Sequence, residues 1–109
     1  MGIDEDLVFK ALADVSRRKL LDRLRRKHGL TLSELCKNHA MSRQAVTKHL
    51  AVLEAANLVV TAKRGRQKLH YLNPVPINDI SMRWIGRFER DRVKALHILK
   101  QALEENRHE

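Results

Sequence analysis

The amino-acid sequence predicts a mostly α-helical fold with one β-hairpin, and three observations carry that prediction. Apolar residues recur at helical spacing over most of the 109 residues. Two short runs rich in strand-forming residues, 58–62 and 68–72, flank a turn signal at Arg64 and Gly65. The length suffices for one core with little to spare, so we expect a single domain over residues 1–109.

Two helices are expected in the N-terminal third of the chain. Residues 5–13 place Leu7 and Ala11 on one apolar face, one helical turn apart. A second helix is expected from Ser16 to about Lys27, with its leucines directed inward and its basic residues outward.

Two capping signals mark the helices that follow. Thr31 and Glu34 have the spacing of a capping box, in which each side chain accepts a hydrogen bond from the backbone of the other. Ser42 is a good N-cap for the next helix. Asn57 tolerates the left-handed conformation that ends many helices, so we expect this helix to stop there.

The stretch MSRQAVTKHLAVLEAANLV, residues 41–59, commits one helical face to the core through Val46, Leu50 and Leu53. Gln44 and Lys48 point away from that face. A short helix, a tight turn and a second helix that begins with polar side chains have helix-turn-helix geometry, in which the second helix meets base edges in the DNA major groove.

The hairpin after this helix then serves as a wing whose basic tip reaches phosphates or the minor groove. Arginine suits guanine and glutamine suits adenine, so these residue types fit direct readout of base sequence. The expected fold is a winged helix-turn-helix of order α-α-α-α-β-β-α. The candidate DNA-binding residues are Ser42, Arg43, Gln44, Thr47, Lys48, Lys63, Arg64, Arg66 and Lys68.

One long helix is expected over residues 77–106. At about 30 residues it would be about 45 Å long, more than a domain of this size can cover. Its apolar stripe therefore needs a second surface, and a second copy of the chain is the simplest source; the alternative is a helix that bends and packs within the monomer. The candidate dimer-interface residues are Leu7, Ala11, Ile80, Trp84, Phe88, Leu96, Leu99 and Leu103.

The charge distribution indicates a polyanionic partner, nucleic acid before a membrane surface. The net charge is +9 and the pI is about 10.3. Positive charge gathers in residues 17–27 and 63–68, on both sides of the candidate reading helix. The single cysteine fits a reducing compartment, and the sequence holds neither an apolar run long enough for a membrane span nor a signal-peptide pattern, so we expect a cytoplasmic protein.

Four stretches carry a family resemblance: FKALADVSRRKLLDRL, LTLSEL, MSRQAVTKHLAVLEAANLVV and GRQKLHYLNP. With them the chain resembles an ArsR-type bacterial transcriptional repressor over residues 7 to about 104, and the third stretch is highly specific. The resemblance implies a homodimer that binds an inverted repeat in double-stranded DNA and releases it when a signal arrives. Asn57 stands where the family usually has glycine.

The metal-binding positions of metal-sensing relatives are not filled. Cys36 follows Glu-Leu as in one type of site, but the second thiol position is Asn38. His97 and His108 have the separation of another type, but the carboxylate position is Ala95. Because a tight site needs three or four protein ligands, we expect neither a metal nor a cofactor. The sequence identifies no other effector.

Two other functions stay open. The charge alone would suffice for sequence-independent nucleic-acid binding, and some winged helices serve as protein-interaction modules. An enzyme is not expected, because the sequence shows no nucleophile–base pair at a recognisable spacing and no Gly-rich phosphate loop.

Overall fold

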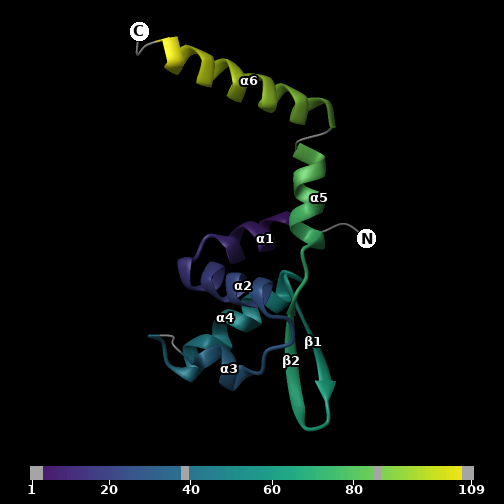
Figure 1. Cartoon of the computed structure of the whole chain (residues 1–109). Coiled ribbons are helices and arrows are strands. Elements are labelled where there is room, and N and C mark those ends of the chain that lie inside the picture. Colours follow the sequence, from purple (N-terminus) through teal and green to yellow (C-terminus); the bar gives the residue numbers. More distant parts are fainter. Residues whose placement is uncertain (1–3, 38–39, 85–86, 107–109) are drawn as a thin grey trace. The chain divides into compact units, whose positions relative to one another are not determined.

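A computed structural model describes residues 4–37, 40–84 and 87–106, without the side chains of 87 and 88 (Figure 1). The chain divides into two compact units, Met1–Ile77 and Asn78–Glu109. The first holds α1 (Glu5–Leu12), α2 (Val15–Arg26), α3 (Leu32–Cys36), α4 (Arg43–Ala55), β1 (Val59–Arg64) and β2 (Gln67–Leu72). Helix α5 (Val75–Trp84) crosses the division, and α6 (Arg87–Asn106) belongs to the second unit.

The core of the first unit lies between helices α1–α4 and the hairpin. Helix α4 contacts α1, α2, α3 and β1, while α2 and α3 also contact β2. The predicted inner face of α4 is confirmed, with Val46, Leu50 and Leu53 buried. Burying an aliphatic side chain of this size typically contributes about 1.5–3 kcal/mol. Fully buried large side chains include Val8, Leu20, Leu24, Leu35, Val46, Leu53 and Leu58.

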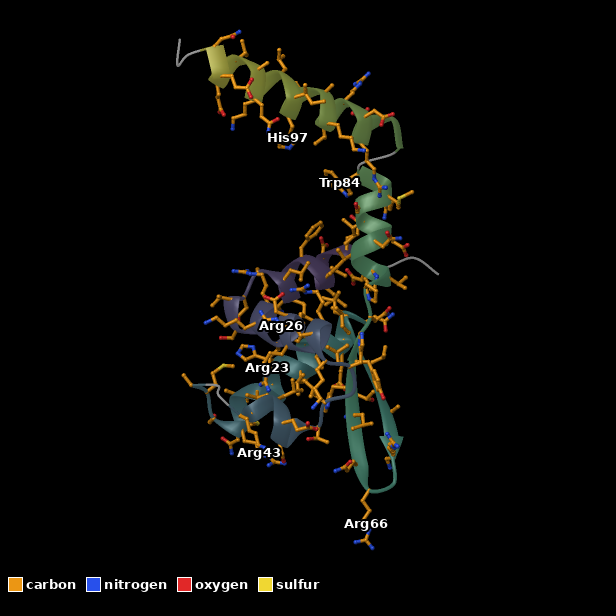
Figure 2. All side chains as sticks on the ribbon, viewed as in Figure 1. Arg23, Arg26, Arg43, Arg66, Trp84 and His97 are labelled. Atoms are coloured by element: carbon orange, nitrogen blue, oxygen red, sulfur yellow. The ribbon has the colours of Figure 1, made fainter. Side chains whose placement is uncertain are left out.

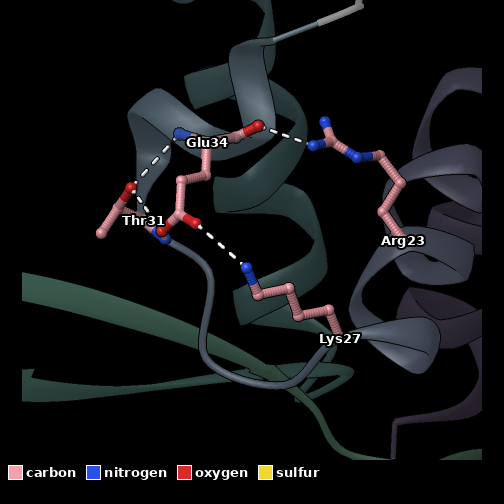
Figure 3. A network of polar contacts seen from close by, with 4 residues as sticks. All are labelled: Arg23, Lys27, Thr31 and Glu34. Carbon is pink, nitrogen blue, oxygen red and sulfur yellow. Dashed lines mark hydrogen bonds and ion pairs between the residues drawn. The ribbon is translucent and has the colours of Figure 1, made fainter.

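A side chain caps the N-terminus of each helix from α1 to α4. The predicted capping box is confirmed, because Thr31 Oγ1 accepts from the Glu34 N–H and Glu34 Oε1 accepts from the Thr31 N–H (Figure 3). Ser42 caps α4 as expected, accepting from the Ala45 N–H. The cap of α2 is Asp14, which accepts from the Ser16 and Arg17 N–H groups, so α2 starts earlier than expected, at Val15.

A two-residue turn joins the two strands of the hairpin. A further backbone segment, from elsewhere in the first unit, pairs with β2. Arg64 pairs with Gln67, and Gly65 between them has a φ of +63°, the conformation in which glycine is favoured. Leu30 forms a β-bridge with His70, and the buried ring Nδ1 of His70 lies 2.9 Å from the Leu30 carbonyl oxygen. Asn57 has a φ of +61°, which confirms its predicted left-handed conformation after α4.

Two arginines of α2 cap the C-terminal end of α1 by donating hydrogen bonds to its last carbonyls. Arg17 donates from Nε to the Ala11 carbonyl and from Nη2 to the Lys10 carbonyl, at 2.8 and 2.9 Å. Arg18 donates to the Leu12 carbonyl at 2.6 Å. The last carbonyls of a helix have no partner within the helix, so these guanidinium groups supply the missing donors.

Arg23 closes α3 in the same way (Figure 3). Its guanidinium donates to the carbonyls of Glu34 and Leu35, both at 2.6 Å, and to that of Lys37 at 3.1 Å. The prediction that the basic residues of the second helix face outward is therefore wrong for Arg17 and Arg23, which are half-buried. The need to give the last carbonyls of a helix a donor outweighs the preference of a charge for water, because the guanidinium keeps its donors bonded.

One expectation about the dimer surface is corrected, and another falls partly outside the described residues. The structure describes the predicted helix over 77–106 as two helical segments, α5 and α6, and residues 85–86 between them lie outside the described residues. Ala11 was expected in a dimer interface, but it is fully buried in the first unit. It has no surface left for a partner.

Replacing Arg23 by methionine should lower the free energy of unfolding by about 1.5–3 kcal/mol, the usual range for hydrogen bonds to a charged group. The reason is that three carbonyls at the end of α3 lose the guanidinium donor, although the Glu34 carbonyl keeps the Lys37 N–H. Urea denaturation followed by circular dichroism measures the change. Arg25→Met on the exposed side of the same helix is the matched control and should cost less than about 0.5 kcal/mol. Equal losses in both variants would contradict the capping role.

Stability should also fall in acid through two capping carboxyls. The Arg17 N–H bond chiefly holds the pKa of Asp14 below 3.8, and the Thr31 N–H bond chiefly holds the pKa of Glu34 below 4.5. A carboxyl with a lowered folded-state pKa contributes stability that is present above its unfolded pKa and lost as the pH falls through the folded value.

The part of the free energy of unfolding that depends on these two carboxyls should therefore be level above about pH 5 and decline below about pH 4. Asp14→Asn keeps a good cap but cannot titrate, so its decline should be shallower than that of the wild type. Asp22→Asn on the exposed face of α2 is the control. Denaturant titrations between pH 7 and 3 test this, and parallel curves for Asp14→Asn and wild type would refute it.

Candidate nucleic-acid interface

The N-terminal end of α4 presents a polar surface backed by the core. Arg43, Gln44, Thr47 and Lys48 are all exposed, and together they line one shallow surface hollow. Their side chains are held there because Val46 on the opposite face is fully buried, which fixes the rotation of the helix about its axis. The structure thus brings together four of the predicted site residues within the first two turns of α4.

Two of the predicted site residues also have structural contacts. Ser42 uses its hydroxyl oxygen to cap α4. The Thr47 hydroxyl donates to the Arg43 carbonyl at 2.9 Å. With its proton engaged, the Thr47 oxygen is left as an acceptor and its methyl group is left for apolar contact, such as contact with a thymine methyl.

The hairpin carries the second set of predicted residues. Every residue from Val60 to Lys68 is exposed, and Arg66 projects beyond the tip of the hairpin (Figure 2). Lys63 lies opposite Lys68 in the strand register. Lys68 Nζ lies 3.5 Å from Glu54 Oε1, so this lysine links the hairpin to the C-terminal half of α4. No local pattern of residues predicts this ion pair.

A groove separates the hairpin from the two helices of the helix-turn-helix. Its walls are polar or basic at most positions, and cations enter it from both α4 and β2. Such a groove suits a phosphodiester backbone, because cationic side chains on both walls can contact successive phosphates. The lining residues are Thr31, Leu32, Ser33, Arg43, Thr47, Leu50, Glu54, Arg66, Gln67, Lys68 and His70.

The basic cluster of residues 17–27 contributes fewer free cations than its composition suggests. Arg17, Arg18 and Arg23 are engaged with helix carbonyls. Lys27 Nζ lies 3.7 Å from Glu34 Oε2 (Figure 3). The positive charge available to a polyanion is therefore concentrated more strongly on α4 and the hairpin than the sequence indicated.

The second unit presents an apolar helix surface. All described side chains of α6 are exposed, and Leu96, Leu99 and Leu103 line a hollow along the helix with Lys100, Glu104 and Asn106. Leu96 is 64% exposed, and Trp84 at the end of α5 is 70% exposed (Figure 2). Large exposed apolar patches typically mark interaction sites. The side chain of Phe88 lies outside the described residues.

The described part of the chain contains neither a metal-ligand cluster nor a membrane-spanning helix. No group of three or more His, Cys, Asp or Glu side chains there could hold a metal ion. Cys36 is half-buried and His97 is exposed; Asn38 and His108 lie outside the described residues. Among the described residues, no helix has both the length and the apolar character to cross a membrane.

A helix-turn-helix with an exposed polar reading end, followed by a basic hairpin, defines a winged helix-turn-helix protein. Residues 16–72 match the family described as HTH domain. The HTH-type transcriptional regulator YuzN of Bacillus subtilis is 37% identical over 91 residues, covering 78% of this chain and 99% of that protein. The transcriptional repressor SdpR of B. subtilis is 32% identical over 82 residues, covering 74% and 88%.

Solved structures of similar proteins are also transcriptional regulators, as these relatives are. An ArsR-like transcriptional regulator from Rhodococcus sp. RHA1 is 32% identical, with a TM-score of 0.67 and coverage of 89% of this chain and 90% of that one. The ArsR family transcriptional regulator RHA00566 is 31% identical, with a TM-score of 0.60 and coverage of 92% and 89%. The chain belongs to the ArsR-type winged-helix transcriptional regulators. The family regulates transcription through DNA binding and consists of regulators rather than enzymes.

Proposed function

We propose that this protein is a homodimeric, cytoplasmic transcriptional repressor that binds an inverted-repeat operator in double-stranded DNA. The observation that carries the DNA-reading part is the exposed set of Arg43, Gln44, Thr47 and Lys48 on a helix whose other face is buried. These four polar side chains differ in chemistry, and the buried face fixes the rotation of the helix about its axis. They can therefore discriminate between base edges and do more than attract phosphates.

Three further observations support the finer parts of the proposal. The exposed apolar side chains of α6 would be covered by the same helix of a second copy, and a twofold dimer presents two reading helices to a palindromic site. SdpR, which is named a repressor, aligns with most of this chain. A regulator that binds chromosomal DNA works in the cytoplasm of a bacterium. The proposed dimer surface consists of Leu7, Ile80, Trp84, Phe88, Leu96, Leu99 and Leu103.

Sequence-independent binding to nucleic acid and docking to an acidic protein are the two alternatives, and one competition assay separates all three functions. The labelled probe is the upstream DNA of the protein's own gene, and the competitor is random duplex. Retention of the labelled probe against excess random duplex supports the specific regulator. If random duplex displaces the labelled probe as well as unlabelled probe does, the protein binds nucleic acid without regard to sequence. If neither DNA binds, docking to an acidic protein is supported.

The reading residues should be separable from the phosphate-binding residues. Gln44→Ala or Arg43→Ala should cost about 1–3 kcal/mol on the cognate site and relax base preference at one position, because a base-edge contact is lost. Arg64→Ala or Arg66→Ala should weaken all sequences alike and reduce the slope of log K against log salt by about one per lost phosphate contact. Fluorescence anisotropy titrations at several salt concentrations measure both effects. Wing variants that changed base preference would reverse the assignment.

The apolar face of α6 and Trp84 should hold the dimer together. Trp84→Glu or Leu99→Glu would place a charge against an apolar partner surface, so sedimentation should show monomer, and operator affinity should fall because the two half-sites are no longer linked. His97→Glu is the matched control, since His97 lies on the opposite side of α6 from Leu99. It should stay dimeric. A Leu99→Glu variant that remained dimeric and bound normally would place the interface elsewhere.

A further inference from the structure

One guanidinium group joins three helices of the first unit. Arg17, on α2, donates to the Lys10 and Ala11 carbonyls at the end of α1. Its remaining terminal nitrogen, Nη1, lies 3.3 Å from Nδ1 of His49 on α4. His49 is half-buried and follows Lys48 directly along the reading helix. A single side chain thus connects the end of α1 with the helix that carries the reading residues.

The contact between Arg17 and His49 requires a neutral imidazole. An arginine nitrogen can only donate, so Nδ1 of His49 must accept and the ring proton must be on Nε2. Protonation would turn Nδ1 into a second donor and would set two positive charges in direct contact. The hydrogen bond would then be replaced by repulsion.

Other charged groups also lie near His49. Asp14, the N-cap of α2, interacts favourably with a positive imidazole through space, and its carboxylate also accepts hydrogen bonds from the Ser16 and Arg17 N–H groups. From α1, the groups that bind Arg17 are backbone carbonyls, which keep the guanidinium in place. On α4 itself, the neighbouring Lys48 adds another positive charge. Arg17 is the group that contacts the ring itself, at 3.3 Å.

We propose that Arg17 and His49 are positioning residues that hold α4 in its DNA-reading orientation, and that protonation of His49 releases this link and weakens operator binding. The proposal rests on the proposed function, in which α4 reads the operator. Thr47 and Lys48 immediately precede His49, so a shift of the helix at His49 displaces them directly. Because α1 carries Leu7 of the proposed dimer surface, the same link connects that surface with the reading helix.

The test compares the wild type with His49→Asn. The Asn side-chain oxygen lies near the position of Nδ1, so the variant keeps an acceptor for Arg17 but cannot be protonated. Operator duplex and random duplex are titrated at pH 8 and pH 5.5, a range that spans the ordinary titration of histidine, at constant ionic strength. Circular dichroism at both pH values checks that each protein is folded.

At pH 8 the two proteins should bind the operator alike. At pH 5.5 the wild type should bind about three- to tenfold more weakly than His49→Asn, the effect of losing about one net hydrogen bond, with no such difference on random duplex. Arg18→Ala is the matched control, because it removes a guanidinium that also binds the end of α1 but is not bonded to His49. It should keep the pH response of the wild type, whereas Arg17→Met should bind weakly at both pH values.

Parallel pH profiles for the wild type and His49→Asn would overturn the proposal. A wild type without operator preference at pH 8 would instead count against the proposed function. In that case the hydrogen bond between Arg17 and His49 can still be tested by nitrogen-15 NMR of the imidazole at pH 8, which needs no DNA. The proposal requires the Nε2–H tautomer of His49, and a proton on Nδ1 would overturn it.

Discussion

The burial of one face of α4 fixes both the packing of the first unit and the direction of its polar side chains. Val46, Leu50 and Leu53 are buried, and α4 contacts α1, α2, α3 and β1 through this side of the helix. A helix fixed on four neighbours cannot rotate about its axis without exposing these side chains. The same burial that stabilises the first unit therefore sets the direction in which Gln44 and Lys48 point.

The helices around α4 are held by polar contacts at their ends as well as by apolar packing. Short helices such as α3 (Leu32–Cys36) have almost no internal hydrogen bonds, so their free backbone groups must find partners elsewhere. Thr31 satisfies one end of α3 and Arg23 the other. Arg17 does the same for α1 and also reaches His49. Three arginines of α2 thus also serve the fold, so the composition of this helix overstates the number of side chains available to a polyanion.

The two units of the chain differ in how completely they are folded by their own contacts. The first has a buried core, whereas all described side chains of α6 in the second are exposed. Isolated helices in water are marginally stable even at favourable composition. An amphipathic helix of 20 residues with leucines in water gains most from a second apolar surface, which is the physical basis of the proposed dimer.

Local patterns in the amino-acid sequence predict the helix caps at Thr31 and Ser42, the left-handed Asn57, the buried face of α4 and the hairpin. These features follow from residues a few positions apart, so periodicity and capping chemistry suffice. The capping of other helices by Arg17 and Arg23, and the ion pair between Lys68 and Glu54, become visible only in the folded chain. Such contacts join residues distant in the chain, and a charged side chain in a sequence does not disclose whether water or a carbonyl from another helix will be its partner.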